Sequence, residues 1–237
     1  MGRNQWIIIR DPSRQAYLPS STNRELVTVC ETISADWAVL PPMLIVPGVI
    51  HQQCWYTATS IPGNYLVGTC ETGYSNDALI RDRLVHFEKF SAKRQTGTYR
   101  LLLLDRFGSH CTKQFIDYCN NHKIVVFCLP PHSSHLLQPL DVVVFQPYKH
   151  YSAVAVEVAT RMWRGDFDKI EFLDQIDSIH QQTFKPSTIQ SAFRATCLIP
   201  YDSSIVMSKL REAVPTPTPR SLQPFGSGPS IPLTIAT

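Results

Sequence analysis

Two short apolar runs in the middle of the chain constrain its fold more than any other feature. Residues 99–104 (YRLLLL) and 123–129 (KIVVFCL) are apolar almost without a break, and residues 112–121 between them have helical spacing. Strands that are covered on both faces show such continuous apolar character, and parallel strands need a long crossover between them, usually a helix. The pattern therefore predicts an α/β domain in which buried parallel strands alternate with helices.

Segments on the N-terminal side of these runs predict three more strands. Residues 25–31 alternate and are rich in β-branched side chains, residues 43–46 form a short apolar run, and residues 65–69 form a third candidate. Residues 75–90 then change to helical spacing. An early meander of these strands at one edge would make the predicted sheet mixed.

Helical spacing dominates the C-terminal half of the chain. It covers residues 141–164, with Pro147 in the early turns, and then residues 170–184 and 186–196. Pro186 stands in the first turn of its helix, where proline is favoured. The predicted order is therefore strands first, then alternating helices and strands, then helices.

Composition divides the chain into one large domain and a short C-terminal extension. We predict a domain over residues 1–202 and a short helical or linker segment over residues 203–213. Residues 214–237 are rich in proline, serine, threonine and glycine and show no apolar periodicity. Such a segment buries too little apolar surface to offset its ordering entropy, so we predict a disordered tail.

Composition also excludes several classes of protein. The apolar stretches are too short for a membrane-spanning helix, which needs about 20 residues, so we expect no membrane partner. The 7 cysteines include no CxxC pair, and no secretory signal precedes them, which favours reduced thiols in an intracellular protein. The net charge of +3 permits a polyanionic partner without requiring one.

Two carboxylates stand at the ends of predicted elements. Asp105 lies directly after the strand at residues 99–104, and Asp141 lies directly before a helix. Ligands gather at the carboxyl ends of strands in open α/β sheets, and carboxylates brought together there repel unless cations lie between them. Mg²⁺ prefers oxygen ligands and bridges to phosphate, and a pair of such ions supports phosphodiester cleavage.

Each of these carboxylates also has a structural interpretation. An Asp after a strand is often a turn residue, and an Asp before a helix is often an N-cap. A zinc site built from Cys128, His132 and His135 is a further alternative, although no CxxC pair accompanies these residues. The spacing alone leaves the metal-binding and the structural interpretations open.

Basic residues bracket the loop before the strand at residues 99–104. They are candidates for contacts with DNA phosphates, and they are equally typical of a solvated loop. The residues concerned are Lys89, Lys93, Arg94 and Arg100.

Five phrases of the sequence resemble one known family. They are NRELVTVCETISADWAVLPPMLIVPG (residues 23–48), GYSNDALIRDRL (73–84), YRLLLLDRFGSHCTKQFIDYC (99–119), LPPHSSHLLQPLDVVVFQPYK (129–149) and STIQSAFRATCLIPYD (187–202). On these phrases the chain resembles the catalytic domain of the DDE superfamily endonucleases, in particular the pogo/Tigger-like transposases of the fungal type. The proline-flanked HSSHLLQPLD block is the most specific of the matches.

The resemblance implies a fold and a chemistry. Catalytic domains of this family adopt an RNase H-like fold, in which helices flank a mixed sheet, and three acidic residues bind two divalent metal ions, Mg²⁺ or Mn²⁺, to cut and rejoin DNA. Asp105 matches the second acidic residue and Asp141 the third, with 35 residues between them. Four residues match family positions beside the metal site: His110, His132, His135 and Gln138. The resemblance implies that side chains at these positions orient the carboxylates or contact DNA.

The N-terminus departs from the family pattern. The first acidic residue of the family lies on the first strand, in a phrase that resembles DETGF, and this phrase would fall immediately before Met1. The sequence therefore resembles an N-terminally truncated member of the family. Asp11 is the nearest acid, but its surroundings do not match the motif, so we do not expect it to replace the missing carboxylate. Residues 6–10 (WIIIR) are a candidate to fill part of the place of the missing strand.

A second departure lies beside the predicted site. The family usually has Gly-His after its second acid, whereas Arg106 and Phe107 follow Asp105. A bulky cation beside a metal ligand opposes Mg²⁺ binding through crowding and through charge. The DNA-binding helix-turn-helix region that normally precedes this domain also has no counterpart in the sequence. With one carboxylate missing as well, we expect metal affinity to fall sharply.

These features together predict a transposase-derived domain, the product of a transposable element, that binds nucleic acid. Its ancestral activity is metal-dependent DNA cleavage and strand transfer, and we expect this chain to be inactive by itself. The alternative is a domesticated or degenerate relic that binds DNA or protein without cleaving it. The expected partners are DNA and a second copy of the chain in a homodimer, and the resemblance implies a location in the nucleus.

Overall fold

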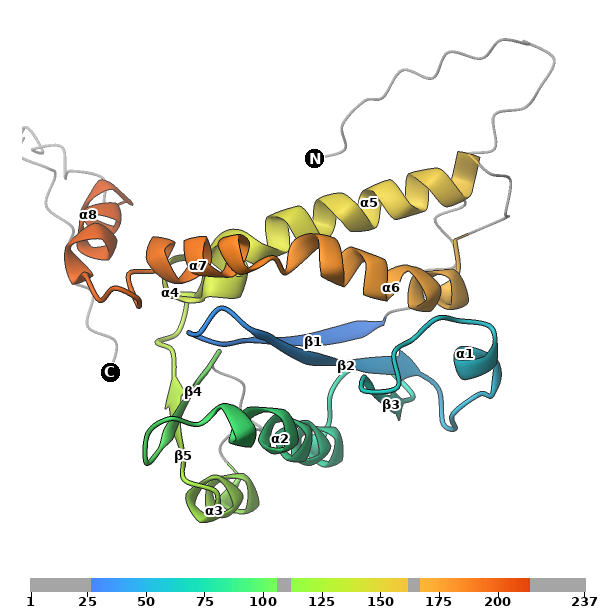
Figure 1. The fold of residues 1–237 in the computed structure, drawn as a ribbon, viewed down its shortest axis with the longest axis horizontal. Helices are drawn as coiled ribbons and strands as arrows, with labels where there is room; N and C mark the ends of the chain where they lie inside the picture. The colour runs from blue at the N-terminus through green and yellow to red at the C-terminus, as the bar shows by residue number, and fades with distance from the viewer. Residues whose placement is uncertain (1–26, 106–111, 162–166, 214–237) are drawn as a thin grey trace, which may run out of the picture.

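The computed structural model describes residues 27–105, 112–161 and 167–213. Along the chain its elements are β1 (Thr28–Ile33), β2 (Val39–Pro47), α1 (Cys54–Thr57), β3 (Leu66–Cys70), α2 (Asp77–Ser91), η1 (Ala92–Arg94), β4 (Arg100–Leu104), α3 (Lys113–Asn121), β5 (Ile124–Cys128), α4 (Ser134–Leu137), η3 (Leu140–Val144), α5 (Phe145–Arg161), α6 (Lys169–Thr183), α7 (Pro186–Ala195) and α8 (Ser203–Ala213). Short sheets flanked by helices make up the fold (Figure 1). The mixed α/β class predicted from the sequence is confirmed.

The first sheet has the strand order β1–β2–β3. β1 runs antiparallel to β2, and β3 runs parallel to β2, so this sheet is mixed. The meander predicted for these strands is wrong for β3, because the connection after β2 carries α1 and returns the chain before β3 begins. Parallel pairing requires a return of this kind.

β2 lies at the centre of the core. Alternate side chains of a strand face opposite sides of its sheet. Leu44 and Val46 pack against α6, whereas Met43 and Ile45 pack against Leu79 of α2. Figure 1 shows these two helices on opposite sides of the first sheet. Cover on both faces explains why this part of β2 contains no polar residue.

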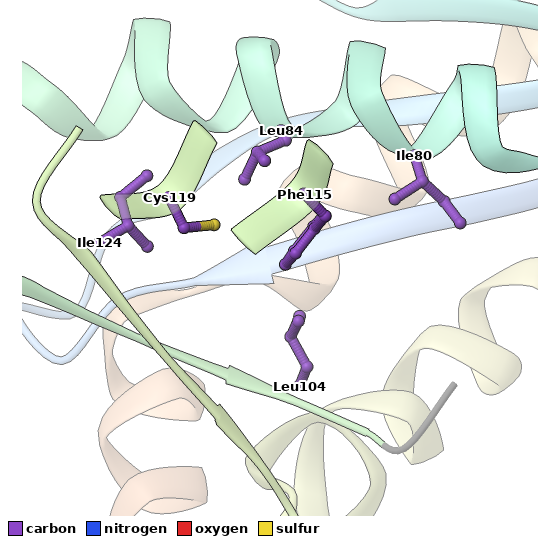
Figure 2. Close-up of a cluster of buried hydrophobic side chains, with 6 residues drawn as sticks. All are labelled: Ile80, Leu84, Leu104, Phe115, Cys119 and Ile124. Carbon is purple, nitrogen blue, oxygen red and sulfur yellow. The ribbon is translucent and has the colours of Figure 1, made fainter. Parts of the chain in front are cut away.

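The second sheet pairs β4 with β5 in parallel, with α3 as the crossover helix. One face packs against α2 and α3 through a buried cluster that consists of Ile80, Leu84, Leu104, Phe115, Cys119 and Ile124 (Figure 2). On the opposite face, Leu101, Val125 and Phe127 are exposed by 64%, 48% and 53%. The prediction that both faces of this strand pair are covered is therefore wrong within the described residues.

The two sheets do not join within the part of the chain that the structure describes. β1 is an outer strand of the first sheet, and β4 belongs to a separate two-stranded sheet. The sequence predicted one mixed sheet, and the described residues instead form two. The segment that the sequence analysis assigned to the missing position, residues 6–10, lies outside the described residues. An RNase H-like arrangement of the strands stays a prediction.

Local signals account for the starts of four helices. The side chains of Asn76 and Thr112 cap α2 and α3 by accepting hydrogen bonds from backbone N–H groups. Asp168 and Glu171 form a reciprocal capping box at α6. Pro186 occupies the first turn of α7, as the sequence predicted. These helix ends are therefore specified by the residues that immediately surround them.

A buried polar pair ties the first sheet to α6. Glu31 of β1 is 4% exposed, and its Oε2 lies 3.2 Å from Nε2 of His180. The hydroxyl of Tyr65 donates a hydrogen bond to Oδ1 of Asp177, on the same helix, at 3.0 Å. Because buried polar groups are stable only with partners, these contacts favour one placement of α6 on the sheet.

The structure describes one of the two C-terminal segments that the sequence distinguished. Residues 203–213, expected to be a short helical or linker segment, form the helix α8. Residues 214–237, expected to be a disordered tail, lie outside the described residues. The division of the chain into domains stays a prediction.

Candidate functional site

Asp105 lies at the carboxyl end of β4, where the chain leaves the second sheet. The last residue of the strand, Leu104, is buried, and its carbonyl oxygen accepts a hydrogen bond from the N–H of Leu129 at 2.8 Å. This bond extends the β4–β5 ladder one residue beyond β5. It therefore holds the loop that follows β5 next to Asp105, which is itself exposed.

The loop after β5 turns back and supplies a partner for Asp105. The carbonyl oxygen of Pro130 accepts hydrogen bonds from both the N–H and the hydroxyl of Ser133. His132 adopts a left-handed conformation in this turn, with φ of 59°. The hydroxyl of Ser134, at the start of α4, then donates a hydrogen bond to Oδ2 of Asp105 at 3.0 Å. The HSSH block therefore orients the Asp105 carboxylate.

Asp141 lies on η3, a π-helical turn that runs directly into α5. Pro139 occupies the N-cap position of this turn, and no side chain caps it. The interpretation of Asp141 as an N-cap is therefore wrong. π-Helical turns are rare and are found frequently at functional sites. Here the turn buries Val144 completely while Asp141 stays exposed.

The two carboxylates influence each other. Partial desolvation of its carboxyl group raises the pKa of Asp141, the negative charge of Asp105 raises it further, and the positive charge of Lys149 on α5 opposes both effects. A like charge shifts a pKa in this way only at short range. Asp105 and Leu140, the residue before Asp141, line the same cavity, so the fold places near one another two acids that have 35 residues between them in the sequence.

The described part of the chain does not gather a larger set of potential metal ligands around the two acids. Within residues 27–105, 112–161 and 167–213, no group of three or more His, Cys, Asp or Glu side chains could hold a metal ion. The alternative zinc site of Cys128 and the two loop histidines is therefore wrong. The assignment of Asp105 and Asp141 as metal ligands stays a prediction.

Comparison with known families identifies the origin of this site. Residues 23–193 match the family described as DDE superfamily endonuclease. The chain belongs to this family. The matched range includes both Asp105 and Asp141, and membership indicates a nuclease ancestry of the transposase kind. Endonucleases of this superfamily generally use divalent metal ions. The narrower pogo/Tigger assignment and the N-terminal truncation stay predictions.

One curated protein that matches this DDE-family chain is named "MFS-type transporter clz9", from Cochliobolus lunatus. It is 32% identical over 188 residues, which are 79% of this chain and 20% of that protein. The chain thus spans about a fifth of the length of this relative. Among the described helices, none is both long and apolar enough to cross a membrane. No solved structure matches the chain.

Three of the four other residues that the family resemblance singled out lie between β5 and η3. His132 and His135 are exposed, and Gln138 directly follows α4 and is half-buried. The Oε1 atom of Gln138 is buried and has no hydrogen-bond partner among the described residues. His110 lies outside the described residues. A role for these side chains in orienting ligands or contacting DNA stays a prediction.

The sequence did not predict a role for two residues that act on the acids of this DDE domain. Ser134 hydrogen-bonds Asp105, and the charge of Lys149 lowers the pKa of Asp141. Both lie inside the phrase LPPHSSHLLQPLDVVVFQPYK, which carries the family resemblance. A single serine or lysine gives no signal by its type alone, so only the fold reveals these contacts.

Two of the four basic candidates for phosphate contacts have acidic partners. Arg94 forms an exposed ion pair with Asp36. Arg100 is largely buried, pairs with Glu88 and donates a hydrogen bond to the hydroxyl of Ser91. Arg100 therefore fastens the start of β4 to the end of α2. Its contacts support a structural role and give no support to a contact with DNA.

Proposed function

We propose that the chain is a transposase-derived domain of the pogo/Tigger type, and that the surface around Asp105 and Asp141 binds DNA. The observation that carries this proposal is that Asp105 lines one cavity together with Pro139 and Leu140, which directly precede Asp141. These are the two acids that match catalytic positions of the family. They meet beyond the carboxyl end of a parallel strand, where ligands gather in α/β sheets.

The donors present fit Mg²⁺ or Mn²⁺. Both side chains offer carboxylate oxygens, which such cations prefer, and both are exposed, so a hydrated ion has access to them. A cation bound between the carboxylates would offset their mutual repulsion. When bound, divalent ions of this kind supply Lewis acidity and activated water for phosphodiester cleavage.

Neighbouring residues hold and tune these carboxylates. Ser134 restricts the rotation of Asp105 by donating a hydrogen bond to it. Lys149 favours the ionised form of Asp141, and its exposed ammonium group suits contact with a DNA phosphate. The exposed His132 and His135 are further candidates to donate hydrogen bonds to the DNA backbone.

We further propose that the chain does not cleave DNA by itself. Family members use three acids, and the described residues bring together two. The residue after Asp105 is Arg106, whose bulk and charge oppose a bound cation. A relic that binds DNA or protein without cleaving it is the second candidate function, and the same two departures favour it.

Location and assembly belong to the same proposal. A location in the nucleus and a homodimer as the working form rest on the family resemblance. The transport activity in the name of the fungal relative is not carried over to this chain, because the match covers 20% of that protein.

A nicking assay on supercoiled plasmid DNA with Mg²⁺ or Mn²⁺ tests the proposed loss of cleavage. We expect no metal-dependent nicking by the wild-type chain. The variants are Asp105→Ala and Asp141→Ala, and the matched control is Asp117→Ala, at an exposed position on α3. Nicking by the wild type and the control that disappears in both site variants would refute the proposed inactivity.

A gel-shift titration tests DNA binding separately. We expect the wild type to retard duplex DNA and the double variant His132→Ala, His135→Ala to bind more weakly, because two donors to the phosphates are removed. Asp117→Ala should bind like the wild type. If the wild-type chain binds no DNA at any salt concentration that keeps it soluble, the DNA-binding proposal is wrong.

A further inference from the structure

A groove lies between α5 and α6, and it is separate from the cavity that Asp105 lines. Its volume is about 450 Å³. On the α5 wall, Val154 and Val158 are exposed by 40% and 44%. Residues four positions apart on a helix lie on one face, so these two valines form an apolar stripe open to solvent. We call this cavity the α5–α6 groove. An apolar surface bordered by polar residues marks a docking site.

The α6 wall of the α5–α6 groove carries negative charge. Glu171 and Asp174 line it, and their carboxylates accept hydrogen bonds from the backbone N–H groups of Asp168 and Ser60. Among the described residues that line the groove, none is Lys or Arg. Two negative charges repel the phosphates of DNA. The groove therefore suits a protein segment that is apolar and positively charged.

The helix α8 has the complementary properties. Val206 is buried, whereas Ile205 and Met207 are exposed by 42% and 49%. Two basic residues and one acidic residue give the helix a net charge of +1: Lys209, Arg211 and Glu212. Short helices that place apolar side chains in a groove are a common mode of recognition between proteins. α8 is therefore apolar like the groove and opposite to it in charge.

α8 is held away from the acidic wall of its own groove. Figure 1 shows α8 beyond the end of α7, at the opposite side of the molecule from the start of α6. Residues 196–202 connect α7 to α8, and a bridge between Leu198 and Tyr201 folds this connection into a compact turn. The matching helix for the groove of one chain is therefore that of another chain.

We propose that α8 of one copy binds in the α5–α6 groove of a second copy, and that two such contacts form a homodimer. This inference rests on the homodimer of the proposed function and names its interface. Each copy offers one groove and one helix, so a two-fold axis pairs both grooves with both helices and closes the assembly. The exposed side chains of Ile205 and Met207 are then covered by the apolar stripe of the partner copy.

Lysine substitutions on the two surfaces test the proposal in the full chain. Val158→Lys changes the groove and Met207→Lys changes the helix. The matched control is Val85→Lys on α2, where the valine is exposed by 47% and does not line the groove. Analytical ultracentrifugation measures the dissociation constant of the dimer. We expect both site variants to raise it by about tenfold or more, because a cation replaces an apolar contact, and the control to match the wild type.

Mixing the two site variants tests the reciprocal arrangement. A dimer of Val158→Lys alone has two altered grooves, and a dimer of Met207→Lys alone has two altered helices. A mixed dimer retains one intact contact, between the helix of the first variant and the groove of the second. An equimolar mixture should therefore dimerise about tenfold more tightly than either variant alone. A mixture that dimerises no more tightly than its components would overturn the proposal.

The remaining outcomes separate this interface from the proposed function. If the wild type and both site variants dimerise equally, the interface is wrong, whereas the homodimer stands. A wild type that stays monomeric at every concentration contradicts both the interface and the homodimer. The gel-shift titration measures DNA binding independently of these results. Circular dichroism of each variant confirms that a weakened dimer is not the result of unfolding.

Discussion

The two sheets of the molecule contain similarly apolar strands but are covered differently. In β2, Leu44, Ile45 and Val46 are fully buried, because helices lie on both faces of the first sheet. In the second sheet, Leu101 and Phe127 are more than half exposed on the face opposite α2 and α3. An apolar run therefore predicts a strand, but it does not predict whether helices cover both faces of that strand. The tertiary structure determines the cover.

The same comparison explains where the candidate site lies. The well-covered first sheet contributes the fully buried residues of β2 and the buried pair of Glu31 with His180. The less covered second sheet ends at Asp105, which is held by a hydrogen bond from Ser134 instead of by burial. The acid is thus oriented by a loop and accessible to solvent, as the proposed role of a cation ligand requires.

The largest expected difference between the sheets concerns truncation of one aliphatic side chain in each. Ile45→Ala in β2 should lower the free energy of unfolding by about 2–5 kcal/mol, because it leaves a cavity in a fully buried position. Val125→Ala in β5 should lower it by less than about 1 kcal/mol, because half of that side chain is already in water. Urea unfolding followed by circular dichroism measures both values. Similar losses in the two variants would show that the outer face of the second sheet is covered in solution.

A smaller effect is expected at the arginines before β4. Arg100→Ala should lower the free energy of unfolding by about 1–3 kcal/mol, because it leaves the largely buried Glu88 without its cation. Arg94→Ala removes an exposed pair with Asp36 and should change stability by less than about 1 kcal/mol. Thermal unfolding of the two variants beside the wild type gives the ranking. A larger loss for Arg94→Ala would contradict the assignment of Arg100 as the residue that anchors β4 to α2.

Strand and helix positions were largely predictable from sequence because local patterns specify them. The runs at residues 99–104 and 123–129 became β4 and β5, and Pro186 began α7 where proline favours a helix start. How the strands pair and which of their faces are covered was harder to predict from the sequence. The direction of β3 depends on how the chain returns through α1, and the exposure of Phe127 depends on elements distant in sequence.

The candidate site shows the same division. Asp105 and Asp141 were identified because they follow or precede strong signals and match a family motif. The roles of Ser134 and Lys149 were not identified from the sequence, because each residue reaches an acid only through the course of the loop or helix on which it lies. The π-helical turn at Asp141 was missed for another reason: helical periodicity does not distinguish a widened turn from a regular one.

The smallest and most local prediction concerns the coupling of the two acids. Because the charge of Asp105 raises the pKa of Asp141, Asp105→Asn should lower the pKa of Asp141. The asparagine oxygen still accepts the hydrogen bond from Ser134, so the loop should stay in place. The carboxyl carbon of Asp141, followed by NMR during a pH titration, reports the change, and Asp117→Asn is the matched control.

The sign of the accompanying stability effect is also determined. A folded-state pKa above the unfolded value means that ionised Asp141 opposes folding. This opposition is absent below the unfolded pKa, near 3.8, and reaches its full size as the pH rises past the folded pKa. Asp105→Asn should therefore reduce the loss of stability between acidic and neutral pH, whereas Lys149→Ala should increase it. An unchanged titration of Asp141 in Asp105→Asn would show that the two carboxylates lie too far apart in solution to share a cation.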